Sequence, residues 1–385
     1  MKRGKELMNG IRVMSIFGTR PEAIKMAPLV KTLENSEQIE SLVCVTAQHR
    51  EMLDQVLEIF EIIPDYDLDI MKERQSITGI TTRVLEGLEE VIRDAKPDIV
   101  LVHGDTTTTF AGALAAFYNK VKIGHVEAGL RTYNKHEPFP EEMNRVLTTS
   151  LADLHFAPTH KAKDNLLREG VKEEIIFVTG NTAIDALKLT LDDAHVFEEA
   201  FLNSIDFENS RVITVTAHRR ENLGEPLEEI CHAIFNIVEQ YNDVEIVYPV
   251  HMNPVVRKTV NLILGSHPRI HLNEPLNIKD MHNLLNKSYM VMTDSGGLQE
   301  EVPSMGKPVL VLRNVTERPE GVEAGTLKLA GTNKDTIVRL AQELLDSPEI
   351  YNEMAKATNP FGDGQASERI VQAILDFFEL SGGRL

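Results

Sequence analysis

The sequence predicts an α/β protein with two doubly wound Rossmann-like domains, and three observations support this fold class. Short runs rich in β-branched residues alternate with helical patterns through most of the chain, which is typical of parallel βαβ units. The runs form two series, separated by a polar, acidic stretch at residues 192–211 that shows no clear strand. A length of 385 residues with 42% hydrophobic content is enough for two separate cores.

Each series contains five predicted strands. In the first half they are residues 11–17, 42–46, 99–103, 123–126 and 175–178. In the second half they are residues 212–216, 244–248, 269–272, 289–293 and 309–312. A final helix is predicted at residues 367–380, where the spacing of apolar residues gives a stripe that can pack against a domain.

Composition excludes several classes of function. A formal net charge of −19 argues against a nucleic-acid partner, which requires a basic surface. No stretch approaches the ~20 apolar residues of a membrane span, and the start of the chain leads into a strand, so we expect a cytoplasmic protein without a membrane partner. Cys44 and Cys231 lie far apart among apolar neighbours, which predicts buried, reduced thiols. The 13 histidines show no metal-type spacing, so we predict chemistry without a metal.

The run Asp294-Ser295-Gly296-Gly297 follows a predicted strand and precedes a helix that we expect to open at Leu298. The first N–H groups of such a helix have no intrahelical partner and attract phosphate. Glycines leave room for a diphosphate, and Glu301, about one turn later, can accept hydrogen bonds from ribose hydroxyls. The alternative is a tight turn with Asp294 or Ser295 as an ordinary N-cap.

Ligands of open parallel sheets bind at the carboxyl ends of strands, so the residues after each strand are candidates for the site. After the first strand, Arg20 and Lys25 lie near a helix start that Pro21 favours, which suggests contacts to a diphosphate. The alternative is that Arg20 and Lys25 pair with carboxylates on a solvated face.

Three carboxylates follow strands or begin a helix in the same half. Asp105 and Glu127 each follow a predicted strand, and Glu141 begins a helix after a loop with two prolines. Each has an ordinary alternative: Asp105 as a helix cap, Glu127 as a partner of Arg131, and Glu141 as a favourable charge at a helix start. Their convergence on one edge of one domain favours chemistry.

Cationic residues follow strands in the second half. His218 and Arg219 lie in a turn that we expect to face the first domain across a cleft, where they can bind phosphate oxygens. A charged surface turn is the alternative. Arg313 and Arg318, beyond the fifth strand, are expected to add positive charge near the Ser295 loop.

Two other patterns are interpreted as coincidental. The run Asp67-Leu68-Asp69 matches the paired aspartates of metal-dependent glycosyl transfer, but such pairs arise by chance in a chain with 59 acidic residues. Tyr118 and Lys122 have the spacing found in NAD-dependent sugar epimerases, yet no G-x-G-x-x-G follows any strand. We therefore predict no cofactor.

Five motifs together resemble the bacterial non-hydrolysing UDP-N-acetylglucosamine 2-epimerases over nearly the whole chain. They are Gly18-Thr19-Arg20-Pro21-Glu22, His103-Gly104-Asp105, His125-Val126-Glu127-Ala128-Gly129, Thr216-Ala217-His218-Arg219-Arg220 and Asp294-Ser295-Gly296-Gly297. The resemblance implies a glycosyltransferase-B type fold with the active site between the domains. It also implies that the C-terminal helix, 367–385, returns to the first domain. The acidic stretch places the boundary near residue 190, with residues 1–190 in the first domain and residues 191–366 in the second. A homodimer is expected.

The resemblance also implies reversible conversion of UDP-N-acetylglucosamine to UDP-N-acetylmannosamine for cell-envelope polysaccharide. The C2 proton is not adjacent to a carbonyl, so the family expels UDP from C1 with loss of that proton. A 2-acetamidoglucal forms, and UDP adds back with protonation from the other face. Asp105, Glu127 and Glu141 match the family's essential carboxylates, and the division of steps among them stays open. Cations such as Arg20 and His218 assist departure of UDP.

The family's binding positions transfer to this chain as two sets. The expected substrate contacts are Arg20, Lys25, Asp105, Glu127, His218, Leu276, Met281, Ser295, Gly296, Gly297, Glu301 and Arg318. Leu276 and Met281 depart from the polar and aromatic residues of some relatives near the uracil. A regulatory site for a second UDP-N-acetylglucosamine, an allosteric activator, matches Gln48, Arg74, Glu141, Arg219 and His251.

Three other functions stay open. A hydrolysing epimerase would release free N-acetylmannosamine and UDP. A UDP-sugar-dependent glycosyltransferase of the same fold would need an acceptor and would not need the three carboxylates. A nucleotide-sugar sensor would bind without turnover.

Overall fold

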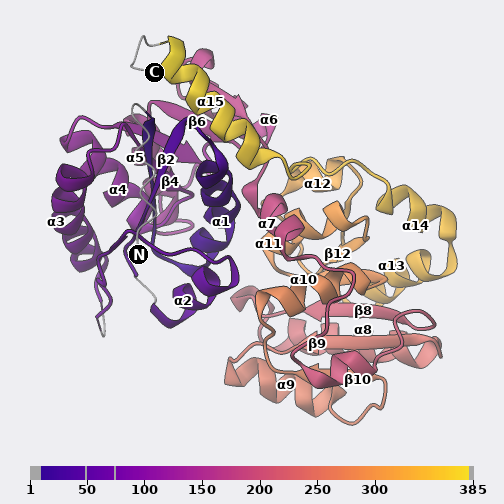
Figure 1. Cartoon of the computed structure of the whole chain (residues 1–385). Coiled ribbons are helices and arrows are strands. Elements are labelled where there is room, and N and C mark those ends of the chain that lie inside the picture. Colours follow the sequence, from indigo (N-terminus) through magenta and orange to yellow (C-terminus); the bar gives the residue numbers. More distant parts are fainter. Residues whose placement is uncertain (1–9, 48–49, 73–74, 381–385) are drawn as a thin grey trace. The chain divides into compact units, whose positions relative to one another are not determined.

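The computed structural model describes residues 10–47, 50–72 and 75–380, and it divides the chain into two compact units. Unit 1 contains Met1–Ala186 and Gly362–Leu385, and unit 2 contains Leu187–Phe361. Each unit has its own parallel sheet and its own core (Figure 1). The predicted α/β class with two Rossmann-like domains is confirmed.

Unit 1 is built on a seven-stranded sheet in the order β3-β2-β1-β4-β5-β6-β7. The strands are β1 Ile11–Phe17, β2 Ile39–Val45, β3 Tyr66–Asp67, β4 Ile99–His103, β5 Lys122–Val126, β6 Leu154–Ala157 and β7 Ile176–Val178. The helices are α1 Arg20–Asn35, α2 Arg50–Ile59, α3 Ile77–Ala95, α4 Thr107–Tyr118, α5 Glu141–Leu151, α6 His160–Arg168 and α15 Ala366–Leu380. Helix α7, Thr182–Thr190, begins in unit 1 and ends in unit 2. Helices α3, α4 and α5 pack in sequence, while α1 contacts α2 and α15 (Figure 1).

The C-terminal helix α15 belongs to unit 1 although its sequence follows unit 2. The carboxylate of Asp185 binds its start, because Ala366 and Ser367 donate their backbone N–H groups at 3.2 and 2.7 Å. Ile370 and Ile374 are fully buried on its apolar stripe. The predicted amphipathic helix is therefore present, one residue longer at its start.

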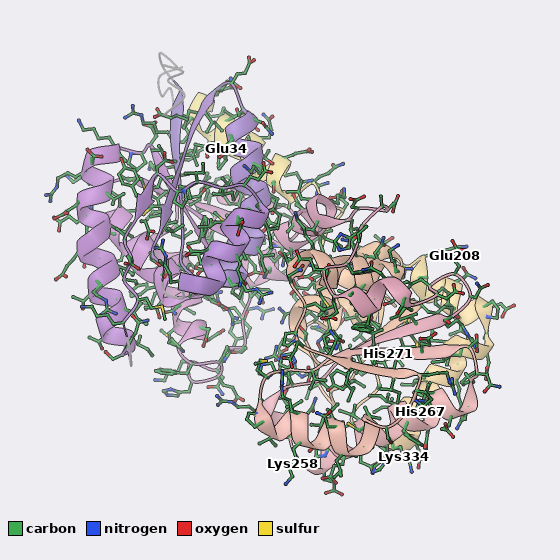
Figure 2. All side chains as sticks on the ribbon, turned by 60° about the horizontal axis from the view of Figure 1, so that its bottom comes forward. Glu34, Glu208, Lys258, His267, His271 and Lys334 are labelled. Atoms are coloured by element: carbon green, nitrogen blue, oxygen red, sulfur yellow. The ribbon has the colours of Figure 1, made fainter. Side chains whose placement is uncertain are left out.

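Unit 2 is built on a six-stranded sheet in the order β10-β9-β8-β11-β12-β13. The strands are β8 Arg211–Thr216, β9 Val244–Pro249, β10 Ile270–Asn273, β11 Met290–Thr293, β12 Val309–Val311 and β13 Leu327–Leu329. The α-helices are α8 Glu225–Gln240, α9 Pro254–Leu264, α10 Ile278–Lys287, α11 Gly296–Glu301, α12 Pro319–Glu323, α13 Lys334–Asp346 and α14 Pro348–Ala355. Charged side chains such as those of Glu208 and Lys258 are exposed at its surface (Figure 2).

Three strands, β3, β6 and β13, were not predicted from the sequence. They have two, four and three residues, too few for a periodic pattern to stand out. The strand predicted to begin at Ile175 begins at Ile176, because Ile175 ends a 3₁₀ turn. The acidic stretch at 192–211 contains a 3₁₀ helix, Ala200–Ser204, and no strand before Arg211.

Sheet order determines where each unit presents loops to a ligand. In unit 1 the order reverses between β1 and β4, and in unit 2 between β8 and β11. All strand pairs at these points are parallel, so their carboxyl ends lie at one edge. Ligands of open α/β sheets bind at such a switch point.

Among the residues described, no helix is long and apolar enough to cross a membrane.

Candidate active site

The turn after β1 is organised by a buried carboxylate, Glu22. Its Oε2 accepts hydrogen bonds from the backbone N–H groups of Gly18 and Thr19 at 3.2 and 2.8 Å. Its Oε1 accepts one from the Thr106 hydroxyl, 2.8 Å away in the turn after β4. Burial raises the pKa of Glu22, while these hydrogen bonds act in the opposite direction. Glu22 therefore ties together the turns on both sides of the switch point.

Gly18 has no room for a side chain. A Cβ there would lie 1.9 Å from Oγ1 of Thr46. The close approach explains a glycine at the end of β1 and keeps the following turn tight.

Arg20 begins α1 and is partly buried. The structure gives its guanidinium no hydrogen bond or ion pair with the residues described, and burial lowers its pKa. The described residues therefore give no carboxylate partner for Arg20 on a solvated face, the alternative weighed from the sequence. A desolvated cation of this kind favours an anionic ligand.

Glu127 follows β5 and is surrounded by polar groups from three other segments. Its Oε1 binds the Lys25 ammonium and accepts a hydrogen bond from Nδ2 of Asn181 at 2.9 Å. Nε2 of His103 lies 3.7 Å from its Oε2. Burial lowers the pKa of His103 to about 4. The site thus places a held carboxylate beside a neutral, buried imidazole.

Arg131 is not the partner of Glu127. Its guanidinium instead binds both carboxylate oxygens of Glu169, at 2.7 and 2.8 Å. The backbone of Glu127 has φ +62°, a conformation that few residues with a side chain adopt. Such strain is typical of functional positions.

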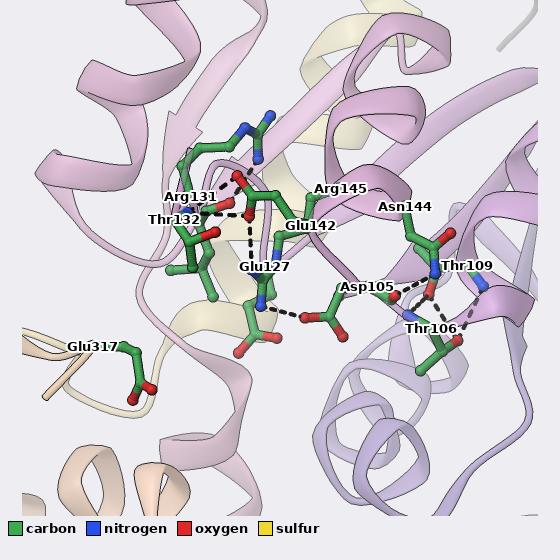
Figure 3. A network of polar contacts seen from close by, with 12 residues as sticks. Asp105, Thr106, Thr109, Glu127, Arg131, Thr132, Glu142, Asn144, Arg145 and Glu317 are labelled. Carbon is green, nitrogen blue, oxygen red and sulfur yellow. Dashed lines mark hydrogen bonds and ion pairs between the residues drawn. The ribbon is translucent and has the colours of Figure 1, made fainter. Parts of the chain in front are cut away.

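Asp105 follows β4 and binds Arg145 of α5. The distance between Asp105 Oδ2 and Arg145 Nη2 is 2.5 Å, and Nδ2 of Asn144 donates to the Asp105 carbonyl at 2.8 Å (Figure 3). Asp105 does not cap α4, because Thr106 occupies the N-cap and accepts from the Thr109 N–H. The carboxylate is consequently a side-chain partner rather than part of a helix end.

Arg145 also bridges Asp105 to a second acid, Glu142. Its Nη1 lies 3.1 Å from Glu142 Oε2 (Figure 3). Glu142 is buried and accepts from the backbone N–H groups of Thr132 and Tyr133, at 3.1 and 2.9 Å for Oε1. This network fixes α5 against the loop that follows β5.

The structure brings Asp105 and Glu127 together, and the same helix that supplies Arg145 begins with Glu141. A Cβ on Gly104, next to Asp105, would lie 3.2 Å from Glu127 Oε2. Oε2 of Glu141 is buried without a hydrogen-bond partner in the described part of the chain. A buried acceptor without a partner is costly and is frequently functional.

In unit 2 the turn after β8 is bound to the end of β11 through Asp294. Oδ2 of this fully buried carboxylate accepts from the backbone N–H groups of His218 and Arg219 at 2.7 and 2.8 Å, and from Nδ2 of Asn222 at 3.0 Å. Asp294 is therefore not a helix cap. It shapes the turn that carries the predicted cations.

The imidazole of His218 is held by two contacts, one with Asp294 and one with His251. Its Nδ1 lies 3.4 Å from Oδ1 of Asp294, and its ring stacks on His251 with centroids 5.0 Å apart. Burial is the largest cause that lowers the pKa of His218, against the opposite effect of Asp294. Contacts within unit 2 therefore fix the orientation of the imidazole.

Helix α11 begins at Gly296, two residues before the predicted start at Leu298. Ser295 occupies the N-cap, but its side chain makes no capping hydrogen bond. A Cβ on Gly296 would lie 3.3 Å from Cζ of Arg318. Glycine thus lets a guanidinium lie against the first turn of α11.

The two arginines of this region bind different glutamates: Arg318 binds Glu300, and Arg313 binds Glu317. Oε1 of the buried Glu300 lies 2.7 Å from both Nε and Nη2 of Arg318. Arg313 binds both carboxylate oxygens of Glu317 and also contacts Glu221 at 3.0 Å. The predicted contribution of Arg313 to the positive charge of the loop is therefore offset by two acids.

The remaining candidates of unit 2 are apolar or acidic. Leu276 is buried in a cluster with Phe197 and Leu202, and Met281 packs against it. Glu301 ends α11, with Nε2 of His282 3.6 Å from its Oε2. For a nucleotide bound at these positions, contacts to the base would be apolar or made by backbone atoms.

Two residues of the expected regulatory set, Gln48 and Arg74, lie outside the described residues. Arg219 and His251 are exposed in unit 2, and Nδ1 of His251 accepts from the Asn253 N–H at 3.1 Å.

Asp67, one of the paired aspartates, binds Arg50. Among the described residues no group of three His, Cys, Asp or Glu side chains could hold a metal. Both cysteines are free and buried, as predicted.

Comparison with known proteins gives this geometry a family. The model of the family described as UDP-N-acetylglucosamine 2-epimerase matches residues 31–375. The chain belongs to the UDP-N-acetylglucosamine 2-epimerase family.

Individual members of the family are similar over almost their full length. The UDP-N-acetylglucosamine 2-epimerase of Bacillus subtilis is 60% identical over 368 residues, covering 96% of each chain. A solved protein from Listeria monocytogenes is 59% identical with a TM-score of 0.92, covering 96% of this chain and 97% of its own. The UDP-GlcNAc 2-epimerase of Neisseria meningitidis, solved bound to UDP-GlcNAc, is 51% identical with a TM-score of 0.86, covering 95% and 100%.

Proposed function

We propose that this chain converts UDP-N-acetylglucosamine to UDP-N-acetylmannosamine and back, without net hydrolysis. The observation that carries the proposal is the strand edge of unit 1, where Glu127 and Asp105 are held by Lys25 and Arg145. Membership of the family and the relative solved with UDP-GlcNAc support the choice of substrate. The product supplies an amino sugar for cell-envelope polysaccharide.

In the proposed reaction a carboxylate of unit 1 removes the proton from C2. The C–H electron pair forms the C1–C2 double bond, the C1–O bond breaks, and UDP departs with that bond's electrons. The resulting 2-acetamidoglucal then accepts a proton at the other face of C2 while UDP adds back at C1. Asp105, Glu127 and Glu141 are the proposed acids and bases, because each lies at this one edge or on α5.

Departure of UDP requires stabilisation of the developing negative charge on the diphosphate. Arg20, which makes no hydrogen bond or ion pair with the described residues, and His218 are the proposed cations for this step. Ser295, Gly296, Gly297 and Arg318 are the proposed diphosphate contacts, and Leu276, Met281 and Glu301 the proposed nucleoside contacts. Lys25 is expected to bind substrate and to hold Glu127.

We also propose that a second UDP-N-acetylglucosamine activates the enzyme at Arg219, His251 and Glu141, together with Gln48 and Arg74. The protein is proposed to act as a homodimer. Activation would be visible as sigmoidal dependence of turnover on substrate. Arg219→Ala should then raise the substrate concentration needed for half-maximal rate and reduce the sigmoidal shape.

Incubation with UDP-N-acetylglucosamine alone in deuterated water tests the reaction. The expected result, followed by proton NMR, is intact UDP-N-acetylmannosamine with deuterium at C2 in both UDP-sugars. Free N-acetylmannosamine as the main product would instead identify a hydrolysing epimerase. No product in the absence of an acceptor would favour a glycosyltransferase, and binding without any turnover would favour a sensor.

A further inference from the structure

His282 of α10 makes two contacts with two different segments of unit 2. Its side chain is only 5% exposed. Nδ1 lies 2.6 Å from the hydroxyl of Thr190, at the end of α7, and Nε2 lies 3.6 Å from Oε2 of Glu301, at the end of α11. One imidazole therefore links the segment where the chain enters unit 2 to the helix proposed to bind the nucleotide.

The hydrogen-bond pattern assigns the orientation of this ring. The Thr190 hydroxyl donates to the Leu187 carbonyl at 2.9 Å, so in this arrangement its oxygen accepts from His282. The hydrogen is then on Nδ1, and Nε2 is the atom that faces Glu301. Rotation of the ring would break a short, buried contact.

Neighbouring residues of α10 hold the same entry segment. Oδ1 and Oδ2 of Asp280 accept from the backbone N–H groups of Glu198 and Glu199 at 3.2 and 3.1 Å. The amide of Asn283 donates to the Thr190 carbonyl at 2.9 Å and accepts from the Asp192 N–H at 3.0 Å. Thr190 is consequently fixed relative to α10, and so is the imidazole that it binds.

Glu301 needs a defined direction if it is to select a ribose. Its side chain is 14% exposed, and its Oε1 would lie 3.4 Å from a Cβ on Gly297, so the carboxylate lies beside the first turn of α11. The gap of 3.6 Å to His282 is longer than a hydrogen bond. The Nε2 edge of the imidazole therefore borders the carboxylate without a direct hydrogen bond, and the Nδ1 bond to Thr190, which a phenyl ring cannot make, keeps that edge in place.

We propose that His282 is a positioning residue that directs the Glu301 carboxylate at the ribose hydroxyls of the bound nucleotide, and that Thr190 fixes His282 for this task. The inference rests on the proposed function, in which Glu301 contacts the nucleoside. Its consequence is specific: loss of the imidazole weakens recognition of the ribose 2′-hydroxyl and leaves the contacts to base and diphosphate in place.

Calorimetric titration of the full-length protein with UDP and with 2′-deoxy-UDP tests this role. A hydrogen bond to a charged group contributes about 1.5–3 kcal/mol, so the parent should prefer UDP by about 10- to 100-fold. In His282→Phe this preference should fall to about twofold, with little change in the affinity for 2′-deoxy-UDP. Thr190→Val, which removes the hydroxyl, should also lower the preference for UDP. Thr190→Ser, which keeps the hydroxyl, should retain the preference of the parent.

His271→Phe is the matched control. His271 of β10, labelled in Figure 2, forms another imidazole–carboxylate pair in unit 2. Its Nε2 lies 2.9 Å from Oε2 of Glu245. Its replacement should leave the preference for UDP unchanged. Circular dichroism monitors folding of every variant, and the Thr190→Val and Thr190→Ser pair provides the test if His282→Phe does not fold.

The outcomes separate this inference from the proposed function. UDP binding by the parent, with an equal preference for UDP in His282→Phe, would overturn the role of His282 alone. An equal loss of affinity for both nucleotides would also overturn it, because a merely structural residue predicts that result. Failure of the parent to bind UDP would contradict the proposed function as well.

Discussion

At the carboxyl edge of the unit 1 sheet, acidic side chains pair with cationic side chains, whereas at the same edge of unit 2 the central acid binds backbone amides. Glu127 contacts Lys25 in unit 1, and Asp105 contacts Arg145. In unit 2, Oδ2 of Asp294 accepts from the amides of His218 and Arg219. In the proposed function, the first arrangement keeps carboxylates at the edge for proton transfer, and the second uses a carboxylate to hold the turn that carries the cations.

This contrast teaches that two similar sheets can support different chemistry through the partners of their acids. A carboxylate held by a cation from another element keeps a defined direction and can still exchange that partner. A fully buried carboxylate that accepts hydrogen bonds from the backbone stabilises the local fold. The following changes test whether the two edges have separate tasks, beginning with the largest expected effect.

Glu127→Gln should remove the proposed base of unit 1 and lower turnover by about 1000-fold. The affinity for UDP should change by less than about threefold, because the proposed diphosphate contacts lie elsewhere. NMR of product formation and calorimetry with UDP measure the two effects. Glu169→Gln, which removes the partner of Arg131, is the control. Turnover within tenfold of the parent would show that Glu127 is not an essential acid or base.

Gly296→Val should act on the other edge and weaken UDP binding and turnover together. Its Cβ would meet the Arg318 guanidinium at 3.3 Å, and the two added methyl groups would displace it. Overpacking of this size costs about 1–3 kcal/mol, or about 10- to 100-fold in affinity. Gly297→Ala should cost less, since its nearest contact, Glu301 Oε1, lies at 3.4 Å. Reduced turnover with unchanged UDP affinity would assign this loop another role.

Acid should destabilise unit 1 through buried histidines at its strand ends. Burial lowers the pKa of His125 from 6.5 to about 3, so between these values the unfolded chain binds a proton that the folded chain does not. Stability therefore falls as the pH falls through this window, by up to about 1.4 kcal/mol per pH unit for this residue. Urea unfolding at several pH values should show a smaller slope in His125→Gln.

His232→Gln, on an exposed position of α8, is the control for this acid effect and should keep the slope of the parent. Nε2 of His125 donates to the Gly104 carbonyl at 2.8 Å, a contact that a glutamine amide can partly replace. An unchanged slope in His125→Gln would mean that other groups dominate the acid response.

Much of the fold follows from local pattern in the sequence. β1 and β4 have the predicted bounds because each is a largely apolar run in a central position of the sheet, interrupted in β1 only by Arg12 and Ser15. The strand-end motifs were also readable, since sheet topology brings residues after β1, β4 and β5 to one edge. β13, with three residues, was missed because its pattern is too short to distinguish from a turn.

The partners of the candidate residues could not be read from sequence in the same way. Arg145 binds Asp105 across 40 positions, and Glu22 binds Thr106 across 84. Such pairs depend on how helices are placed against the sheet, which local periodicity does not encode. One clue was present: Glu142 and Arg145 have the spacing of neighbours on a helix, and they contact each other.

The hydrogen bonds that Asp294 accepts from the turn after β8 also make hydrogen exchange a measure of how often that turn opens. The amide hydrogens of His218 and Arg219 point into one buried oxygen, although Arg219 itself is exposed. Exchange with deuterium therefore requires the turn to detach from β11. Mass spectrometry of the peptide that contains both residues should show slow exchange in the parent and much faster exchange in Asp294→Ala. The lifetime of these two hydrogens reports how often the cations of unit 2 leave their place.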